Sequence, residues 1–185
     1  MIGKLVQAAI LVTAGLAISA FSGCTPRTSA PAKRPAAPDY QAPVPPSPAA
    51  ASTRATCYNE ADLATMRGRM LQQELSVGTL QCQTSSGSRA FDGQYRSVLS
   101  KFQGDLAENY RALQALARRR GINVDVLVTE FANRTAQKAP VDPEFCSRSL
   151  RALEWALDPK AASLSMVPPP YDIGPDMNIH PCPAQ

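Results

Sequence analysis

Apolar residues recur every three or four positions through the middle of the chain, between about residue 57 and residue 157. This spacing is typical of one face of an α-helix. The first predicted helix covers residues 60–82, because Asn59 followed by Asp62 three positions later is typical of a helix start. Its apolar face consists of Leu63, Met66, Met70, Val77 and Leu80.

The most regular apolar run predicts a second helix between the turn at residues 83–88 and Gly121. Three arginines at 118–120 fill its last turn, where positive charge suits the helix C-terminus, and Gly121 can end it in the left-handed conformation. We therefore interpret the arginines as a helix end and not as a nucleic-acid patch. The apolar positions of this helix are Tyr95, Val98, Leu99, Phe102, Leu106, Tyr110, Leu113 and Leu116.

Two further helices follow. The third covers residues 124–138, and Asp142 with Pro143 opens the fourth, which ends before Pro159. No segment alternates convincingly between apolar and polar residues as a half-buried strand does. The fold class is therefore all-α, a short antiparallel bundle of about four helices. The expected core positions are Val124, Leu127, Val128 and Phe131 in the third helix, and Cys146, Leu150, Leu153 and Leu157 in the fourth.

Proline divides the chain into regions. Eight of the seventeen prolines lie in residues 25–50 and seven in 158–185. One helical domain at 57–157 is therefore expected between a linker at 24–56 and a tail at 158–185. The linker is rich in proline and alanine with a single aromatic residue, Tyr40, so we expect a disordered spacer that reaches up to roughly 90 Å.

The tail contains the motif PPPY at residues 168–171, a sequence that WW domains bind. Such domains are not expected outside a bacterial cytoplasm, so we interpret the tail as an ordered segment that packs on or near the bundle. Tyr171 and Ile173 would supply the contact, and the tail would add few further residues to the core.

The chain opens with Lys4 and an apolar run, the layout of a secretory signal peptide, here residues 1–23. The sequence FSGC at 21–24 resembles the bacterial lipobox, in which a cysteine receives a diacylglycerol before cleavage. The resemblance implies lipidation of Cys24, and Thr25 after it implies passage to the outer membrane, facing the periplasm. The alternative is ordinary cleavage, which leaves Cys24 as a thiol or a disulfide partner.

Two stretches, MRGRMLQQELSVGTLQC at residues 66–82 and FANRTAQKA at 131–139, make the domain similar to small envelope proteins of Gram-negative bacteria. The resemblance implies a compartment, the cell envelope. It brings no activity and no binding site.

Four further cysteines, an even number in an exported chain, predict two disulfides. Cys57 and Cys82 stand at opposite ends of one predicted helix about 30 Å long, too far apart for a bridge. The up-and-down order of the helices then favours Cys82 with Cys146 and Cys57 with Cys182. A zinc site that includes His180 is the competing interpretation, but the chain has no CxxC spacing.

Candidate catalytic residues are few. Glu74 and Glu130 could act as acid and base across a cleft, as in a cell-wall lytic enzyme, and His180 could activate Cys182. No substrate-binding motif accompanies either pair, so we expect no enzymatic activity and no cofactor or metal.

The formal net charge of +4 falls to +3 when Lys4 leaves with the signal peptide, and we expect no nucleic-acid partner. The favoured function is a lipid-anchored envelope protein that binds or scaffolds another envelope protein. Two alternatives stay open. One is a cell-wall enzyme or peptidoglycan-binding accessory that uses Glu74, Glu130 or the basic residues Arg67, Arg69 and Arg148. The other is a carrier of a small ligand in the bundle core.

Overall fold

The computed structural model describes residues 38–43 and 57–182. The expected signal peptide, Cys24 and most of the linker lie outside the described residues. The fold class is confirmed: the described part is helical and contains no strand beyond isolated bridges. Its elements are α1 (Glu60–Gln81), α2 (Asp92–Lys101), α3 (Gln103–Arg120), α4 (Val124–Lys138) and α5 (Phe145–Leu157), followed by the 3₁₀ turns η1 (Leu164–Met166) and η2 (Pro175–Met177).

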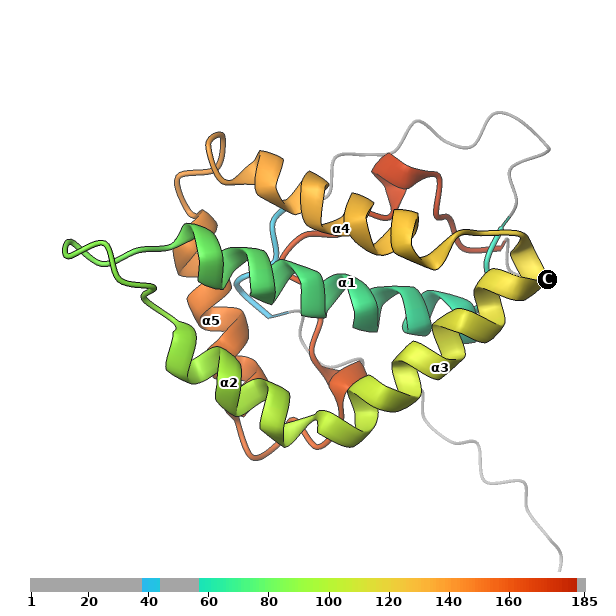
Figure 1. The fold of residues 1–185 in the computed structure, drawn as a ribbon, viewed down its shortest axis with the longest axis horizontal. Coiled ribbons are helices and arrows are strands. Elements are labelled where there is room, and N and C mark those ends of the chain that lie inside the picture. Colours follow the sequence, from blue (N-terminus) through green and yellow to red (C-terminus); the bar gives the residue numbers. More distant parts are fainter. Residues whose placement is uncertain (1–37, 44–56, 183–185) are drawn as a thin grey trace, which may run out of the picture. The chain divides into compact units, whose positions relative to one another are not determined.

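Helix α1 is the central helix, and α3, α4 and α5 all pack against it (Figure 1). The prediction of a single apolar face is wrong for α1, because neighbours surround most of it. Leu71 and Leu75 are buried in addition to the expected core residues, and so are Asp62, Arg69 and Glu74. Leu80, in contrast, is 47% exposed at the last turn.

The second predicted helix is two helices, α2 and α3, which meet at Phe102. Phe102 has φ −106° and ψ 22°, outside the helical region, and its side chain is buried. The change of direction lets α2 pack on α5 while α3 packs on α1 (Figure 1). One straight helix could not reach both neighbours. Tyr110, an expected core residue, is exposed on α3.

The end of α3 follows the prediction. Gly121 adopts φ 66° in the left-handed region and ends the helix after the three arginines. Arg119 Nη2 lies 2.8 Å from Asp62 Oδ1, at the start of α1. Arg120 lies 3.5 Å from the same carboxylate and donates to the carbonyl of Cys57. These arginines therefore join the end of α3 to the start of α1.

Helix α5 runs across the end of α1 instead of antiparallel to it (Figure 1). Its predicted buried face is only partly correct: Leu153 is buried as expected, but Cys146 is exposed, and Leu150 and Leu157 are only partly buried. Small residues lie on the buried face because α5 passes close to α1. That face consists of Phe145, Ser149, Ala152, Leu153 and Ala156.

Both predicted disulfides are present. Cys82 and Cys146 have Cα atoms 5.6 Å apart, and Cys57 and Cys182 have theirs 4.7 Å apart. The Cys82–Cys146 bridge joins the C-terminal end of α1 to the first turn of α5. The Cys57–Cys182 bridge joins the chain just before α1 to the end of the described tail. The predicted pairing is therefore confirmed, but one step of its reasoning is not: α5 crosses α1 instead of running back along it, and the tail covers the distance to Cys57.

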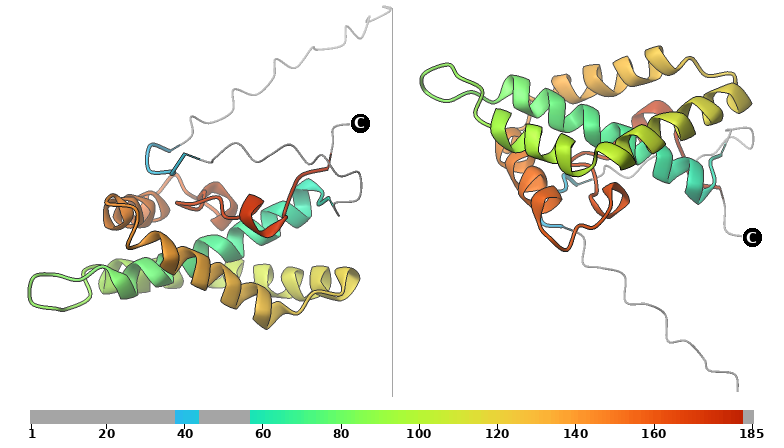
Figure 2. Two further views of the ribbon diagram at one scale, coloured as in Figure 1. Left: turned by 90° about the horizontal axis from the view of Figure 1, so that it is seen from above. Right: turned by 60° about the horizontal axis from the view of Figure 1, so that its bottom comes forward.

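The tail packs along α1 and returns toward Cys57 (Figure 2). Tyr171 and Ile173 are buried, as expected, but the expectation of few further core contacts is wrong. The backbone of the tail also bridges Tyr58 at Pro181. Its other buried apolar side chains are Ala161, Leu164, Val167 and Ile179.

Residues 38–43, which we call the Tyr40 segment, pack on the domain, and the expectation of a wholly disordered linker is wrong for them. They belong to the same compact unit as the helices. Tyr40 is only 1% exposed, and the segment lies beside α5 and the tail (Figure 2). A lone aromatic side chain supplies the apolar area that the surrounding prolines and alanines lack.

Candidate functional site

The Tyr40 segment occupies a defined place between α5 and the tail. The Tyr40 hydroxyl donates to the carbonyl of Pro168 at 2.9 Å, and its ring meets the edge of Trp155 with centroids 6.2 Å apart. Gln41 Nε2 donates to the carbonyl of Pro169 at 3.2 Å. The backbone N–H of Ala42 donates to the carbonyl of Pro170 at 2.8 Å. Consecutive residues of the segment thus bond consecutive carbonyls of the tail.

Arg148 of α5 holds the segment from the other side. Its Nη1 donates to the carbonyls of Tyr40 and Gln41 at 3.2 and 3.4 Å. Its Nε donates to Asp142 Oδ2 at 3.0 Å, which fixes the guanidinium in place. We define the docking site as Arg148, Trp155 and the carbonyls of residues 168–170.

Asp142 joins this arginine to the tail. The hydroxyl of Tyr171 donates to Asp142 Oδ2 at 2.7 Å. Burial alone would raise the pKa of Asp142, but hydrogen bonds from Tyr171, the N–H of Glu144 and Arg148 lower it below its usual value. Burial and the bond to Asp142 raise the pKa of Tyr171. The carboxylate is therefore charged and the phenol neutral at neutral pH.

Glu74 lies beneath the same part of the tail. It is 1% exposed, and its Oε2 accepts a 2.8 Å hydrogen bond from the N–H of Tyr171. Its Oε1 has no hydrogen-bond partner among the described residues. Burial raises the pKa of Glu74 well above its usual value, despite the bond from Tyr171. The side chain positions the tail on α1.

The candidate acid–base pair is not assembled. Glu130 lies on the partly exposed side of α4 and pairs with Arg134 at 3.3 Å, whereas Glu74 is enclosed. The hollows described below contain neither carboxylate. The structure therefore does not bring Glu74 and Glu130 together in a cleft.

The three candidate basic residues have different surroundings. Arg69 is buried on α1, hydrogen-bonded to Gln72, with its guanidinium 5.2 Å from the centre of the Tyr110 ring, and burial lowers its pKa. Arg148 holds the Tyr40 segment. Of these three arginines, Arg67 is the one that is exposed and without an ion pair among the described residues.

His180 and Cys182 do not form a nucleophile pair. Cys182 is bonded to Cys57, and the backbone carbonyl of His180 accepts a hydrogen bond from Tyr58. The described residues contain no group of three or more neighbouring His, Cys, Asp or Glu side chains that could hold a metal ion.

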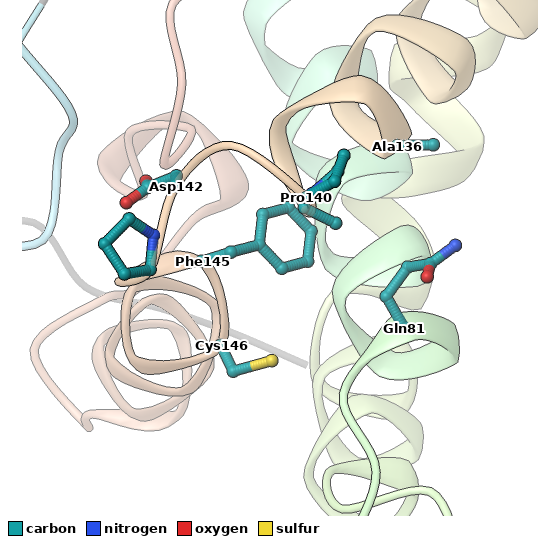
Figure 3. Close-up of a pocket in the computed structure, with 8 residues that line it drawn as sticks. Gln81, Ala136, Pro140, Asp142, Phe145 and Cys146 are labelled. Carbon is teal, nitrogen blue, oxygen red and sulfur yellow. The ribbon is translucent and has the colours of Figure 1, made fainter.

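A hollow of about 520 Å³ lies beside the Cys82–Cys146 bridge. Gln81, at the end of α1, lines one side of this hollow. Phe145 points into the space between the 140–143 turn and α1 (Figure 3). Asp142 points away from the Gln81 side. With its one lining carboxylate bonded to Arg148 and Tyr171, this hollow offers little charge for recognition.

Two other hollows lie along α1 next to the tail, with volumes of about 340 and 60 Å³. Arg67 and Asp172 line both. The larger reaches Gln41 and Pro168 at the Tyr40 segment, and the smaller reaches His180. Opposite charges therefore face each other beside the tail.

Comparisons of this chain with protein-family models, with curated proteins and with solved structures found no match. None of the described helices has the length and apolar composition needed to cross a bilayer.

The docking site was not predicted from the sequence, although one signal was present. Tyr40 is the single aromatic residue in a long stretch without apolar periodicity, and such a residue can anchor a segment on a folded surface. The PPPY motif at residues 168–171 contains the residues that the segment contacts in the tail. Its three proline carbonyls accept the hydrogen bonds of the segment.

Proposed function

We propose that this chain is an exported, lipid-anchored protein of the bacterial cell envelope that binds another envelope protein. The observation that carries the proposal is the pair of disulfides, Cys57–Cys182 and Cys82–Cys146. Structural disulfides form and persist in oxidising compartments and are rare in the bacterial cytoplasm. The paired cysteines support export through the apolar segment at residues 1–23.

The two bridges account for four of the five cysteines of the chain, which leaves Cys24 for another chemistry. Cys24 follows the small residues Ser22 and Gly23, in the order that the lipobox has. A diacylated cysteine that carries a further acyl chain supplies the two or more chains that stable anchoring requires. The proposed location is the outer membrane, on its periplasmic side.

A binding role is favoured over a catalytic one because the candidate catalytic and basic side chains make contacts within the protein. Glu74 holds the tail, and Arg148 holds the Tyr40 segment. Glu130 and Arg134 pair on the surface of α4. These groups stabilise the fold and its attached segments, and the protein then serves as a module displayed from the membrane.

Metabolic labelling with an alkyne fatty acid tests the anchor. Wild-type protein should be labelled and should partition into detergent, whereas Cys24→Ser should accumulate as an unprocessed precursor or as soluble protein. Cys24→Ser that is still labelled and still partitions into detergent would contradict the proposal. Labelling of a Cys182→Ser variant should persist, which separates lipidation from disulfide formation.

Crosslinking in living cells followed by mass spectrometry tests the binding role. A photoreactive residue at exposed position Val141 or Met166 should capture the same envelope protein in replicate cultures. Capture of only the monomer at both positions, with no protein above the level seen without irradiation, would contradict a binding role at these surfaces.

One observation favours a second candidate, a peptidoglycan-binding accessory. Arg67 is exposed and lines two adjoining hollows, where it could meet a carboxylate of a cell-wall peptide. The protein should then cosediment with purified sacculi. Arg67→Gln should lower the cosedimenting fraction more than the matched change Arg96→Gln on α2. Equal retention of both variants, or no cosedimentation, would exclude the accessory role.

A further inference from the structure

The Tyr40 segment contacts the domain as a bound peptide does. One aromatic side chain is fully enclosed, next to a turn in which the N–H of Gln41 donates to the carbonyl of Pro38. Residues 40–42 make polar contacts with the tail and α5. Pro38 is also buried, whereas Asp39 and Pro43 are exposed. Peptide recognition commonly combines one buried anchor with main-chain hydrogen bonds in this way.

The acceptors on the domain are of one kind. Residues 168–170 are three consecutive prolines, which have carbonyls but no N–H groups, so this side of the site can only accept hydrogen bonds. The segment must supply the donors, and it does so with the Tyr40 hydroxyl, the Gln41 amide and the Ala42 N–H. Arg148 supplies the donors for two carbonyls of the segment.

The segment belongs to no helix and to neither disulfide, although Tyr40 is part of the hydrophobic core cluster. The chain between residues 43 and 57 connects the segment to the domain. The segment can therefore leave its site without opening a helix or a bridge.

We propose that the docking site is a peptide-binding site for a tyrosine-containing segment of an envelope protein that forms a turn at its tyrosine, and that the Tyr40 segment occupies it in cis. The partner peptide carries a tyrosine whose hydroxyl reaches Pro168, followed by residues that donate to Pro169 and Pro170. The proposal names the class of partner for the binding role proposed above, and it takes the compartment of that partner from the proposed function. The chemistry of the site is inferred only from the contacts between the Tyr40 segment and the domain.

A cis segment competes strongly, because its short connection gives it an effective concentration that can reach the millimolar range. The free site is therefore a minor state in the wild-type chain, and the apparent association constant for a partner peptide is the intrinsic one multiplied by the fraction of molecules whose site is free. Removal of Tyr40 takes away the buried anchor and should open the site.

The experiment uses the mature chain with both disulfides formed and a fluorescein-labelled peptide with the sequence of residues 37–44, APDYQAPV. By fluorescence anisotropy, Tyr40→Ala should bind this peptide at least about tenfold more tightly than wild type does. The same peptide with phenylalanine in place of tyrosine should bind more weakly, since the carbonyl of Pro168 then lacks its donor. Asp39→Ala, which changes an exposed residue of the same segment, should behave as wild type.

Trp155 provides a second readout, because it is the only tryptophan of the chain and it contacts Tyr40. Tyr40→Ala should shift its emission, and unlabelled peptide should return the emission toward that of wild type. Ala42→Pro removes one donor of the segment and leaves the docking site unchanged, so it repeats the test if Tyr40→Ala does not fold.

Several results would overturn the proposal. These are no binding to a folded variant, equal binding to variant and wild type, and equal binding of the tyrosine and phenylalanine peptides. None of them bears on the lipid at Cys24, which the labelling experiment tests separately. Conversely, loss of labelling at Cys24 would leave peptide binding in solution intact.

Discussion

Gly78 on α1 and Ser149 on α5 lie in direct contact. A Cβ atom placed at Gly78 would come within 2.5 Å of Ser149 Oγ and 2.8 Å of Ser149 Cβ. Ser149 is buried, and its hydroxyl donates to the carbonyl of Phe145. The close approach explains why small residues fill the face of α5 that crosses α1.

Gly78→Ala should therefore destabilise the protein, although alanine is the better helix former. The added methyl group must push α5 away, and such overpacking costs about 1–3 kcal/mol. Thermal and urea unfolding measure the change. Gly93→Ala is the matched control, because a Cβ there meets nothing within 4 Å, and it should leave stability unchanged or raise it by up to about 1 kcal/mol. Equal effects of the two changes would show that the contact is not tight.

Glu74→Gln should make the protein more stable near pH 8. The pKa of Glu74 is raised in the folded state, so its contribution to stability is full below the pKa of the unfolded chain and is lost as the pH rises through the folded pKa. Glutamine stays neutral and retains an oxygen for the N–H of Tyr171. The difference in melting temperature between variant and wild type should therefore grow from pH 5 to pH 8.

Two comparisons distinguish the pH dependence caused by Glu74 from that of other carboxyl groups. Glu130→Gln, on a partly exposed carboxylate, should show no comparable trend. The lowered pKa of Asp142 gives the opposite dependence, since its contribution is present above about pH 4 and is lost as the pH falls through the folded pKa. A Glu74→Gln difference that shrinks as the pH rises would contradict the burial of an ionisable carboxyl at this position.

Both disulfides should contribute strongly to stability. The bridges close loops with sequence separations of 64 and 125 residues. Chain entropy then predicts about 4 kcal/mol for Cys82–Cys146 and about 5 kcal/mol for Cys57–Cys182. We expect the double variant Cys57→Ser/Cys182→Ser to lose at least as much stability as Cys82→Ser/Cys146→Ser, because the tail carries buried side chains. Urea denaturation of the two variants checks the order, and a tail that frays without loss of global stability would reverse it.

The sequence predicted both ends of α1 and α4, the C-terminal end of α3 and the disulfide pairing, and the helix ends have local causes. It did not predict the division into α2 and α3, and α5 begins at Phe145 instead of at Asp142 and Pro143. Asn59 caps α1 through a hydrogen bond to the N–H of Asp62, and Gly121 ends α3. The pairing then followed from the order of the helices. Local signals of this kind act within one or two turns and do not depend on distant parts of the chain.

The sequence did not predict features that arise from packing between elements. Phe102 belongs to a continuous apolar pattern, and the break there follows from α2 and α3 having different neighbours. The buried face of α5 is set by its close contact with Gly78. A prediction of the Tyr40 site would have required the positions of Pro168 and Arg148 in space, and both residues lie more than one hundred residues away along the chain.

The docked Tyr40 segment should also limit how far the domain can stand from a membrane anchor. If the chain is tethered at Cys24, only residues 24–37 separate the anchor from the docked segment, and at about 3.1 Å per residue they reach about 45 Å. When the segment leaves its site, the tether extends to residue 56 and reaches about 100 Å. Docking therefore halves the reach that the linker composition alone predicts.

This difference can be measured on vesicles that hold a maleimide lipid, to which the mature chain is coupled through Cys24. Energy transfer from Trp155 to an acceptor dye in the bilayer surface should be lower on average for Tyr40→Ala than for wild type, because the released domain samples longer distances. Asp39→Ala should match wild type. Free peptide APDYQAPV at saturating concentration should lower the transfer of wild type toward that of Tyr40→Ala, since it displaces the cis segment. Equal transfer for wild type and Tyr40→Ala, with Trp155 emission shifted in the variant, would show that release of the segment does not lengthen the tether.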